Sequence, residues 1–291
     1  MSVVVAEPAL IAAKPRGGWR RFARRNPTIV AGGAILAIIA ALAILAPLFA
    51  GDAITMQPAL RLRPPSETNW FGTDHLGRDV FARTVYGARV SLFVGIAVAA
   101  MSITGGLFIG LMSGYFRRVD AVVMRLMDGL MAIPAILLAI ALVALTRASV
   151  SAVIVAITIP EIPRVVRLVR AVVLGVREAP YVEAAIAGGT PTWKILLRHI
   201  LPSTIAPLIV QATYICASAI LIEAALSFLG AGTPPEIPTW GNMIAQSRLF
   251  LSRAPWTIFA PGIALALVVL GVNLLGDGLR DRLDPRLARR M

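Results

Sequence analysis

Four long runs without charged residues constrain the fold of this chain more than any other feature. They cover residues 28–51, 90–116, 203–222 and 256–276, and each reaches the roughly 20 apolar residues that carry an α-helix across the hydrocarbon core of a bilayer. Hydrophobic residues make up 58% of the chain, and the mean hydropathy is +0.80. The sequence therefore predicts an all-α polytopic membrane protein.

Two weaker segments complete the predicted topology. Residues 128–146 form a third span with Pro134 inside it, and residues 148–160 begin a fourth before Glu161, Pro163 and Arg164 interrupt the apolar run. Both ends of the chain are rich in arginine, and both lie in the cytoplasm only if the number of crossings is even. We therefore expect six transmembrane helices, with most of the 28 basic residues on the cytoplasmic side and the polar connection at residues 52–89 as the main exception.

This topology also explains the basic charge. A net charge of +13 could indicate nucleic-acid binding, but the basic residues alternate with apolar spans instead of forming one stripe, so we expect no nucleic-acid partner. Arg20, Arg21 and Phe22 mimic a twin-arginine export signal, yet the apolar run that follows is too long for a signal-peptide core. We predict an uncleaved first helix, with basic cytoplasmic tails at residues 1–27 and 278–291.

The connection after the first helix is polar and rich in proline and glycine, which makes it too irregular to lie in lipid. We assign residues 28–88 to the first helix and this external connection, and residues 89–277 to the transport core. Asp74, His75 and Asp79 in the connection could suggest a metal site. No second histidine is nearby and Arg78 brings a competing positive charge, so we expect a structural turn with a short helix, and no metal.

Two regularly spaced triplets mark helix surfaces. Gly106, Gly110 and Gly114 lie four residues apart, a spacing that lets helix backbones approach closely without identifying the partner helix. A second triplet follows the fourth span and is expected to anchor its cytoplasmic end among the phosphates of membrane lipid. It consists of Arg164, Arg167 and Arg170.

A polar stretch within the core, residues 181–202, has the pattern of two helices joined by a glycine hinge. Pro180 suits the first turn of a helix, where its missing N–H costs nothing. Gly188 and Gly189 end that helix, because glycine adopts the left-handed conformation of a C-cap without strain. Thr190 then offers an N-cap, and Pro191 offers a first helical position for the second helix.

The second helix is predicted to present one apolar face, with Lys194 and Arg198 on another, as suits a helix at a membrane surface. The apolar face consists of Trp193, Leu197, Ile200 and Leu201. The stretch as a whole resembles the EAA motif of bacterial ABC importer permeases. The matching residues are Glu183, Ala184, Ala185 and Gly189, followed by Ile200, Leu201 and Pro202.

This resemblance implies a cytoplasmic coupling loop, residues 177–202, that docks into a cleft on an ATPase subunit. The residues expected to carry the contact are Glu183, Ala184, Ala185, Gly189, Trp193, Leu201 and Pro202. Two alanines let surfaces approach, Glu183 offers a charge for a basic partner, and Gly189 permits the bend. The alternative is an ordinary basic connecting loop.

Two more blocks narrow the resemblance to the C-type permease subunits of dipeptide, oligopeptide and nickel importers. They are WFGTDHLGRDVFARTVYGARVSL at residues 70–92 and the stretch from EAALSFLG at residues 223–230 to DRLDPR at 281–286. The resemblance implies the transmembrane domain fold of a type I ABC importer, in the bacterial inner membrane. It also implies a second homologous permease chain, two ATPase subunits and an external substrate-binding protein. Small peptides are the expected substrate, with nickel chelates, glutathione or oligosaccharides as alternatives.

Motifs for catalysis are missing from the sequence. Neither lysine follows a glycine, so the chain has no GxxxxGK[ST] phosphate loop, and ATP with its magnesium ion is expected on the partner ATPase subunits. No HExxH, CxxC or GxSxG occurs, and the predicted topology puts His75 and His199 on opposite sides of the membrane. We expect no catalytic residue and no cofactor in this chain. An autonomous channel or an ion-coupled carrier remains an alternative, although it leaves the EAA stretch unexplained.

Glu223 is the one further candidate, because an ionisable residue inside a predicted span is a functional candidate by default. About 20 residues from Ser203 reach the opposite face of the membrane, so Glu223 is expected near the external mouth, where its burial costs less. It has either a structural role, such as pairing with a group of a partner subunit, or a role in an outer gate or the substrate pathway.

Overall fold

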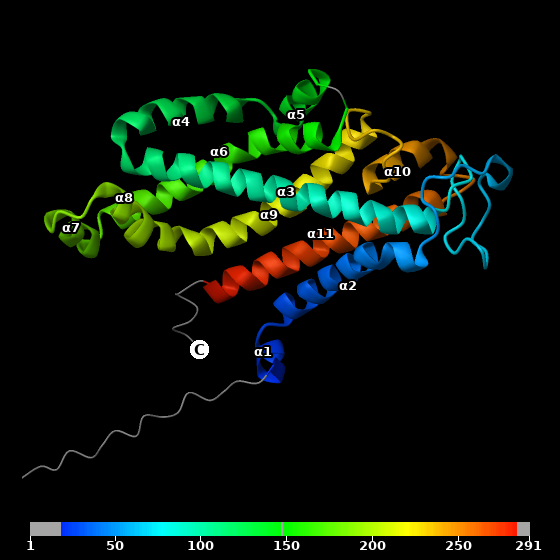
Figure 1. Ribbon diagram of the computed structural model, residues 1–291, viewed down its shortest axis with the longest axis horizontal. Helices are drawn as coiled ribbons and strands as arrows, with labels where there is room; N and C mark the ends of the chain where they lie inside the picture. Colours follow the sequence, from blue (N-terminus) through cyan, green and yellow to red (C-terminus); the bar gives the residue numbers. More distant parts are fainter. Residues whose placement is uncertain (1–18, 147, 284–291) are drawn as a thin grey trace, which may run out of the picture.

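The computed structural model describes residues 19–146 and 148–283, and these residues form an all-α structure (Figure 1). The long helices are α2 (Pro27–Phe49), α3 (Val80–Tyr115), α6 (Val150–Arg177), α9 (Leu201–Phe228) and α11 (Trp256–Leu283). The shorter ones are α1 (Trp19–Arg25), η1 (Pro58–Leu60), α4 (Arg117–Ala132), α5 (Ala135–Ala144), α7 (Pro180–Ala187), α8 (Thr192–Lys194), η2 (Ile195–Ile200), α10 (Trp240–Ser247) and η3 (Arg248–Phe250).

Six segments correspond to the predicted spans, and they differ in how well their length and hydropathy suit a membrane crossing. Within the described part of the chain, four helices are long and apolar enough to cross a membrane: α2, α3, α11 and the continuous stretch from α8 through α9. The pair α4 and α5 would be a fifth, but the two helices meet at 88°. The last segment, α6, is 28 residues long and carries several charged residues, so it does not qualify by composition.

The third span differs from its prediction. Instead of one kinked helix over residues 128–146, a polar helix that begins at Arg117 ends before Pro134, and α5 starts in a new direction. Proline disfavours a helical conformation in the residue before it, and Ile133 is extended, with ψ at 128°. The break is therefore complete.

The sequence left the limits of the fourth span open, and the structure places them at the ends of α6. Pro160 and Pro163 lie inside α6, which continues without interruption to Arg177. Glu161 is fully buried, and its carboxylate accepts a hydrogen bond from Arg164 at 3.0 Å. A charge that is paired inside the fold does not end a helix, which is why the apolar run underestimated the length of α6.

The boundary predicted between residues 88 and 89 also falls inside a helix. The short helix expected after Asp79 is the start of α3, which runs for 36 residues. Asp79 caps it, because its side chain accepts a hydrogen bond from the backbone N–H of Phe81 at 2.9 Å. Arg83 and Arg89 are therefore helical, although the sequence placed them in the polar connection.

The glycine triplet of α3 packs within this chain. A Cβ atom at Gly110 would lie 2.7 Å from Cβ of Val169, and one at Gly114 would lie 2.6 Å from Cβ of Val173, both on α6. The close approach predicted from the glycine spacing is confirmed, and α6 is the partner helix that the sequence left open. The contact extends along both helices and forms the centre of the largest hydrophobic core.

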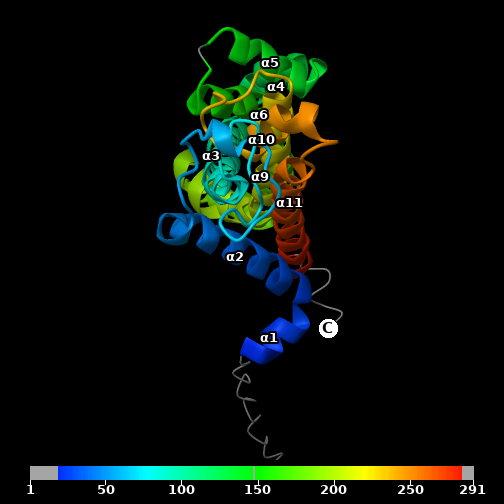
Figure 2. The same cartoon turned by 90° about the vertical axis from the view of Figure 1, so that its right-hand side faces the viewer.

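The helices run back and forth along the long axis of the molecule (Figure 1). The start of α2, the junction of α3 with α4, the α7–α8 region and the end of α11 all lie toward one end. Toward the other end lie α10 and the connection between α2 and α3, which Figure 2 shows from the front. The arrangement agrees with an even number of crossings. It gives the molecule one end with the α7–α8 region and an opposite end with α10 and the connection after α2.

Candidate functional site

The predicted helix–glycine–helix pattern is confirmed in its first half. Pro180 occupies the first turn of α7, and Gly189 follows the helix with φ at +74°. The backbone N–H of Thr190 donates to the carbonyl of Ala185, and that of Gly189 donates to the carbonyl of Ile186, both at 3.0 Å. These two bonds form a Schellman cap, which requires a residue in the left-handed conformation.

The second half differs in register from the prediction. Pro191, not Thr190, is the residue before the helix, and α8 leads directly into a π-helical turn, η2. A π-helical turn holds an extra residue, so it rotates the side chains that follow it. Ile195, Leu196 and Ile200 are buried as a result.

The predicted apolar face is therefore split. Trp193 and Leu197 are 60% and 54% exposed, whereas Ile200 is fully buried and Leu201 is half-buried. The prediction that these four side chains share one face was wrong, because it assumed a regular α-helix. The π-helical turn instead provides a buried anchor, formed by Ile195, Leu196 and Ile200. The large apolar side chains of Trp193 and Leu197 stay on the surface.

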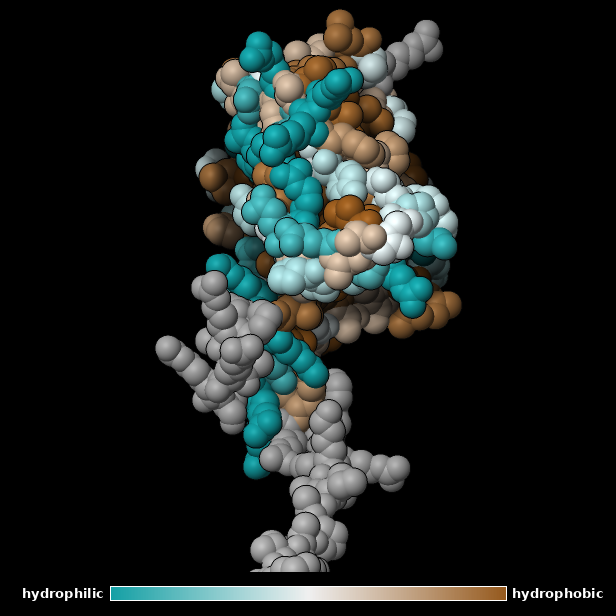
Figure 3. Space-filling model, turned by 90° about the vertical axis from the view of Figure 1, so that its left-hand side faces the viewer, coloured by the Kyte–Doolittle hydropathy of each residue, from teal (hydrophilic) through white to brown (hydrophobic). Residues whose placement is uncertain are grey.

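Together with α7 these side chains form one exposed region, here called the α7–η2 surface. It consists of the exposed residues Tyr181, Glu183, Ala184, Ile186, Trp193, Lys194, Leu197 and Arg198. Val182 is buried beneath it and fixes α7 to the core. Figure 3 views this end of the molecule and shows hydrophobic side chains among hydrophilic ones. A mixed surface of this kind, with exposed Trp and Tyr, is typical of a contact site for another protein.

The structure brings the predicted contact residues to this region with different exposure. Glu183, Ala184, Gly189, Trp193 and Pro202 are exposed, whereas Ala185 and Leu201 are half-buried. Glu183 takes part in no ion pair within residues 19–146 and 148–283, and a Cβ at Gly189 would meet no atom within 4 Å. Most of the set is thus open to a partner.

Glu223 lies one turn before the end of α9 and is fully buried. Its Oε1 accepts a hydrogen bond from the hydroxyl of Ser227 at 2.9 Å, and its Oε2 has no hydrogen-bond partner within the described part of the chain. Helix α10 packs directly beside it, since a Cβ at Gly241 would lie 2.6 Å from Cα of Ala224. The position near the end of the span agrees with the prediction, and both roles stay open.

The arginine triplet of α6 has partners that the sequence did not reveal. Arg167 pairs with Asp128, and Arg170 pairs with Asp120 through Nη2 and Oδ2 at 2.7 Å, while Arg164 pairs with Glu161. The pairs of Arg167 and Arg170 fasten α4 to α6, whereas that of Arg164 lies within α6, and the expected role as lipid anchors stays a prediction. The only sequence signal was the three-residue spacing from Glu161 to Arg164, because the other two pairs depend on tertiary folding.

The candidate metal residues behave as the structural alternative predicted. Asp74 accepts hydrogen bonds from the backbone N–H groups of Leu76 and Arg78, and its other oxygen pairs with Nε of Arg78 at 2.6 Å. Among residues 19–146 and 148–283, no cluster of His, Cys, Asp and Glu side chains has the arrangement of a metal site. The turn at Gly77, with φ at +77°, is built on these contacts.

Comparisons with known proteins agree with this fold. A family model described as binding-protein-dependent transport system inner membrane component matches residues 102–289. A second model, described as the N-terminal TM domain of oligopeptide transport permease C, matches residues 16–65. The structure is similar to a chain of the MetNI methionine ABC transporter in an inward-facing conformation, with a TM-score of 0.55, 20% identity and coverage of 69% of this chain and 96% of that chain. This likeness shows the fold, that of a type I importer transmembrane domain.

Relatives match over almost the whole chain. The sequence is 60% identical over 270 residues to a probable peptide ABC transporter permease protein, y4tQ, of Sinorhizobium fredii, and the match covers 93% of each chain. It is 44% identical over 266 residues to the dipeptide transport system permease protein DppC of Alkalihalophilus pseudofirmus, with coverage of 91% and 88%. Proteins of this kind are multi-pass inner-membrane permeases, and separate subunits hydrolyse ATP for them. The chain belongs to the binding-protein-dependent transport system inner membrane component family, the permease subunits of ABC importers.

Proposed function

We propose that the α7–η2 surface is the cytoplasmic docking site for an ATPase subunit, in an importer that carries small peptides through the membrane. The observation that carries the proposal is the exposure of Trp193 and Leu197 over a buried anchor, beside the carboxylate of Glu183, which forms no ion pair within residues 19–146 and 148–283. An ATPase cleft with basic and apolar lining would complement this surface. ATP and magnesium would bind there, on the partner subunit.

The way the surface joins the bundle supports a mechanical role. Helix α7 follows α6 after a short turn at residues 178–179, and η2 is continuous with α9. Helix α6 packs along α3, and α9 packs against both α3 and α11. A displacement of the docked surface would therefore move α6 and α9 together, and the bundle would rock between inward-open and outward-open states as the ATPase subunits close and separate.

The orientation follows from charge. Toward one end of the molecule lie α1 with Arg24 and Arg25 in its last turn, the start of α2, the end of α11 with Arg280 and Arg282, and the α7–η2 surface (Figure 1). The positive-inside rule puts such an end in the cytoplasm. On this basis residues 1–27 and 278–291 are cytoplasmic tails, residues 28–88 hold the first helix and the external connection, and residues 89–277 form the transport core with its coupling loop at 177–202.

A complete importer would contain a second homologous permease, two ATPase subunits and an external substrate-binding protein. The peptide substrate is supported by the names of both relatives, which refer to peptide or dipeptide transport. Nickel chelates, glutathione and oligosaccharides are the alternatives within the same class of importer, because selectivity rests largely on the external binding protein.

Reconstitution in liposomes tests this proposal. The chain would be inserted alone, with the second permease, and with all the cognate subunits, and uptake of labelled di- and tripeptides would be followed with and without ATP. We expect uptake only from the complete set and only with ATP. Uptake by the chain alone would instead indicate an autonomous channel or an ion-coupled carrier. A complete set that hydrolyses ATP but moves another substrate would overturn the peptide assignment alone.

A further inference from the structure

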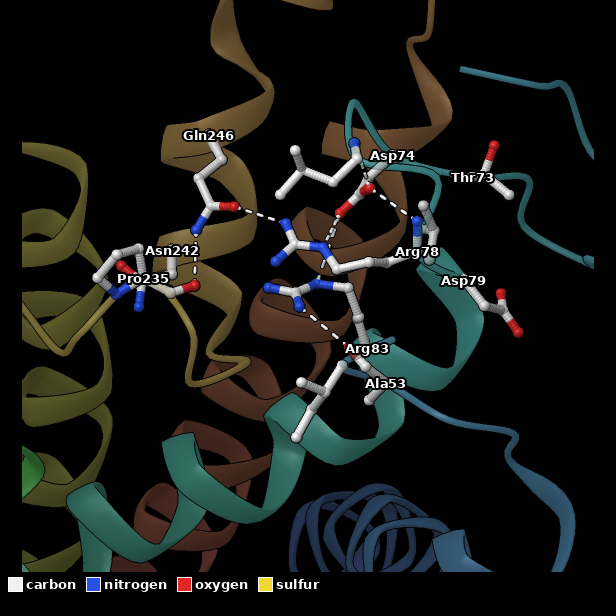
Figure 4. A network of polar contacts seen from close by, with 12 residues as sticks. Ala53, Thr73, Asp74, Arg78, Asp79, Arg83, Pro235, Asn242 and Gln246 are labelled. Carbon is white, nitrogen blue, oxygen red and sulfur yellow. Dashed lines mark hydrogen bonds and ion pairs between the residues drawn. The ribbon is translucent and has the colours of Figure 1, made fainter. Parts of the chain in front are cut away.

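A second polar site lies at the other end of the molecule, away from the α7–η2 surface. It joins the connection after α2 to the first turn of α3 and to α10 (Figure 4). The Nε atom of Arg78 pairs with Oδ2 of Asp74 at 2.6 Å, and its Nη2 donates to Oε1 of Gln246 at 2.7 Å. Arg83 lies next to them, with its Nε at 3.8 Å from the same Asp74 oxygen.

The charges of this cluster do not balance. Arg78 and Arg83 are 3% and 1% exposed, and arginine keeps its proton in proteins. Asp74 is the only carboxylate ion-paired with either of them within the described ranges 19–146 and 148–283. Figure 4 shows the carboxylate of Asp79 directed away from both guanidinium groups. The buried cluster therefore carries one uncompensated positive charge.

His75 does not change this sum. Its ring stacks on Phe250 with the centroids 5.4 Å apart, and its Nδ1 is buried without a hydrogen-bond partner among the residues that the structure describes. Burial lowers the pKa of His75, and although Asp74 raises it, the nearby arginines lower it further. The lowered pKa favours the neutral form of the ring, which adds no positive charge to the cluster.

One guanidinium group also has unused donors. Nη1 of Arg83 donates to the backbone carbonyl of Ala53 at 3.1 Å, but Nη2 is buried and has no partner within the residues described. Arg83 lines a cavity of about 10 Å³, together with Asp74, His75, Arg78, Val80, Met243, Gln246, Ser247 and Thr257. That volume is close to the minimum of about 10–15 Å³ for a single occupant of the size of a water molecule.

The backbone adds to the positive potential in this cavity. Val80 is the first residue of α3, and Thr257 is the second residue of α11. The N-terminal end of a helix carries a partial positive charge that favours an anion within its first turn. Two such ends meet at the cavity, beside the free donors of Arg83, and because the carboxylate of Asp79 already caps α3, the end of α11 makes the larger contribution.

We propose that this cavity binds one small monovalent anion, with chloride as the simplest occupant, between Arg83, Arg78 and the N-terminal ends of α3 and α11. A water molecule would accept the hydrogen bond from Nη2 but would leave the charge uncompensated. A buried charge without a counter-charge is strongly unfavourable, so an ion that supplies the missing charge is the better occupant. The bound anion completes the contacts that hold α3, α10 and α11 together at this end.

Halide-dependent unfolding tests the proposal. The purified full chain in detergent would be heated in sodium gluconate, chloride or bromide at one ionic strength, over a titration of the halide. We expect chloride and bromide to raise the unfolding temperature saturably, by roughly 2–4 °C. The Arg83→Gln variant should lose this dependence. Arg253→Gln, which removes an exposed arginine, should keep it.

A second pair of variants tests the proposal even if Arg83→Gln does not fold. Met243 is buried and lines the cavity, so Met243→Glu would place a carboxylate where the anion is proposed. We expect Met243→Glu to unfold at the same temperature in gluconate and in chloride, while the neutral Met243→Gln keeps the chloride response. A wild-type unfolding temperature that is the same in gluconate and chloride would overturn the proposal, as would a chloride response that persists unchanged in Met243→Glu.

Discussion

The two ends of the bundle differ in whether their tryptophan side chains bind to the rest of the chain or face outward. At the end with α10, two indole N–H groups bridge distant segments: the buried Trp240 donates to the carbonyl of Thr84 at 3.0 Å, and the half-buried Trp256 donates to that of Thr73 at 3.2 Å. The α7–η2 surface instead exposes Trp193 and leaves Glu183 unpaired in the described structure. At the end with α10 the large side chains are tied to their own chain, with the cavity beside Arg83 as the exception, whereas the other end has polar and apolar groups to offer to a partner.

A helix cap with a left-handed glycine occurs at both ends, so the two ends can be compared by the same substitution. Gly230 follows α9 with φ at +80°, and the N–H of Ala231 donates to the carbonyl of Leu226 at 2.8 Å, as in the cap at Gly189. A Cβ at either glycine would meet no atom within 4 Å. At both positions the backbone is left-handed, so any other residue would be strained, and an added side chain would meet open space. They differ in the surface around them, because only Gly189 borders the α7–η2 surface.

The largest effect is expected from Asp74→Asn, which removes the carboxylate between two buried arginines. Breaking a buried ion pair from one side costs about 3–5 kcal/mol, so the variant should lose most of its folded, inserted protein. Size-exclusion profiles and unfolding temperature in detergent would measure the loss. Asp52→Asn, which alters an exposed residue of the same connection, is the control. An Asp74→Asn variant as stable as the control would mean that this end does not depend on the cluster.

Gly189→Asp should abolish peptide uptake while the permease stays inserted. The substitution strains the left-handed cap and puts a charge and a side chain on the α7–η2 surface, so we expect uptake to fall on the order of 100-fold, about 2.7 kcal/mol. ATP-dependent uptake normalised to membrane-inserted protein is the measurement. Gly230→Asp creates the same strain at the other end and should retain far more activity. Equal losses in the two variants would assign the effect to the cap alone.

Trp193→Ala should weaken binding of the ATPase subunit without destabilising the chain. Trp is enriched among the side chains that dominate protein interfaces, and its truncation there costs about 2 kcal/mol or more. Pull-down of the ATPase by the detergent-solubilised permease would show reduced retention, with the unfolding temperature unchanged. Trp70 is 62% exposed at the opposite end, against 60% for Trp193, so Trp70→Ala is the matched control. Equal retention by the two variants would place the docking site elsewhere.

The smallest effect is expected from Glu223→Gln. The amide has the same shape and can still accept the hydrogen bond from Ser227, so stability should change by less than about 1 kcal/mol and uptake by less than about threefold. Unfolding temperature and uptake rates would be compared in one preparation. Uptake that falls more than tenfold in a stably folded variant would assign Glu223 to the outer gate or the pathway.

The sequence alone determined those features of the protein that rest on local chemistry. Apolar runs of sufficient length define α2, α3, α9 and α11, because no other local structure satisfies the backbone in lipid. Pro180 and Gly189 define the ends of α7 through their own conformational preferences. The resemblance to ABC importer permeases was likewise readable from residues 70–92 and from the EAA stretch, and the comparisons confirmed the family.

Only the tertiary structure decided what depends on contacts between distant residues. Helix α6 continues past Pro163 because Glu161 is buried beside Arg164, and the arginine triplet pairs with carboxylates of its own chain. The π-helical turn chose which side chains of residues 193–201 face outward, against the regular helical spacing. The cluster around Asp74 joins Arg78 to Gln246, 168 residues away, and no local pattern encodes such a pair. Charge compensation and burial are properties of the packed chain, so they appear only when it is folded.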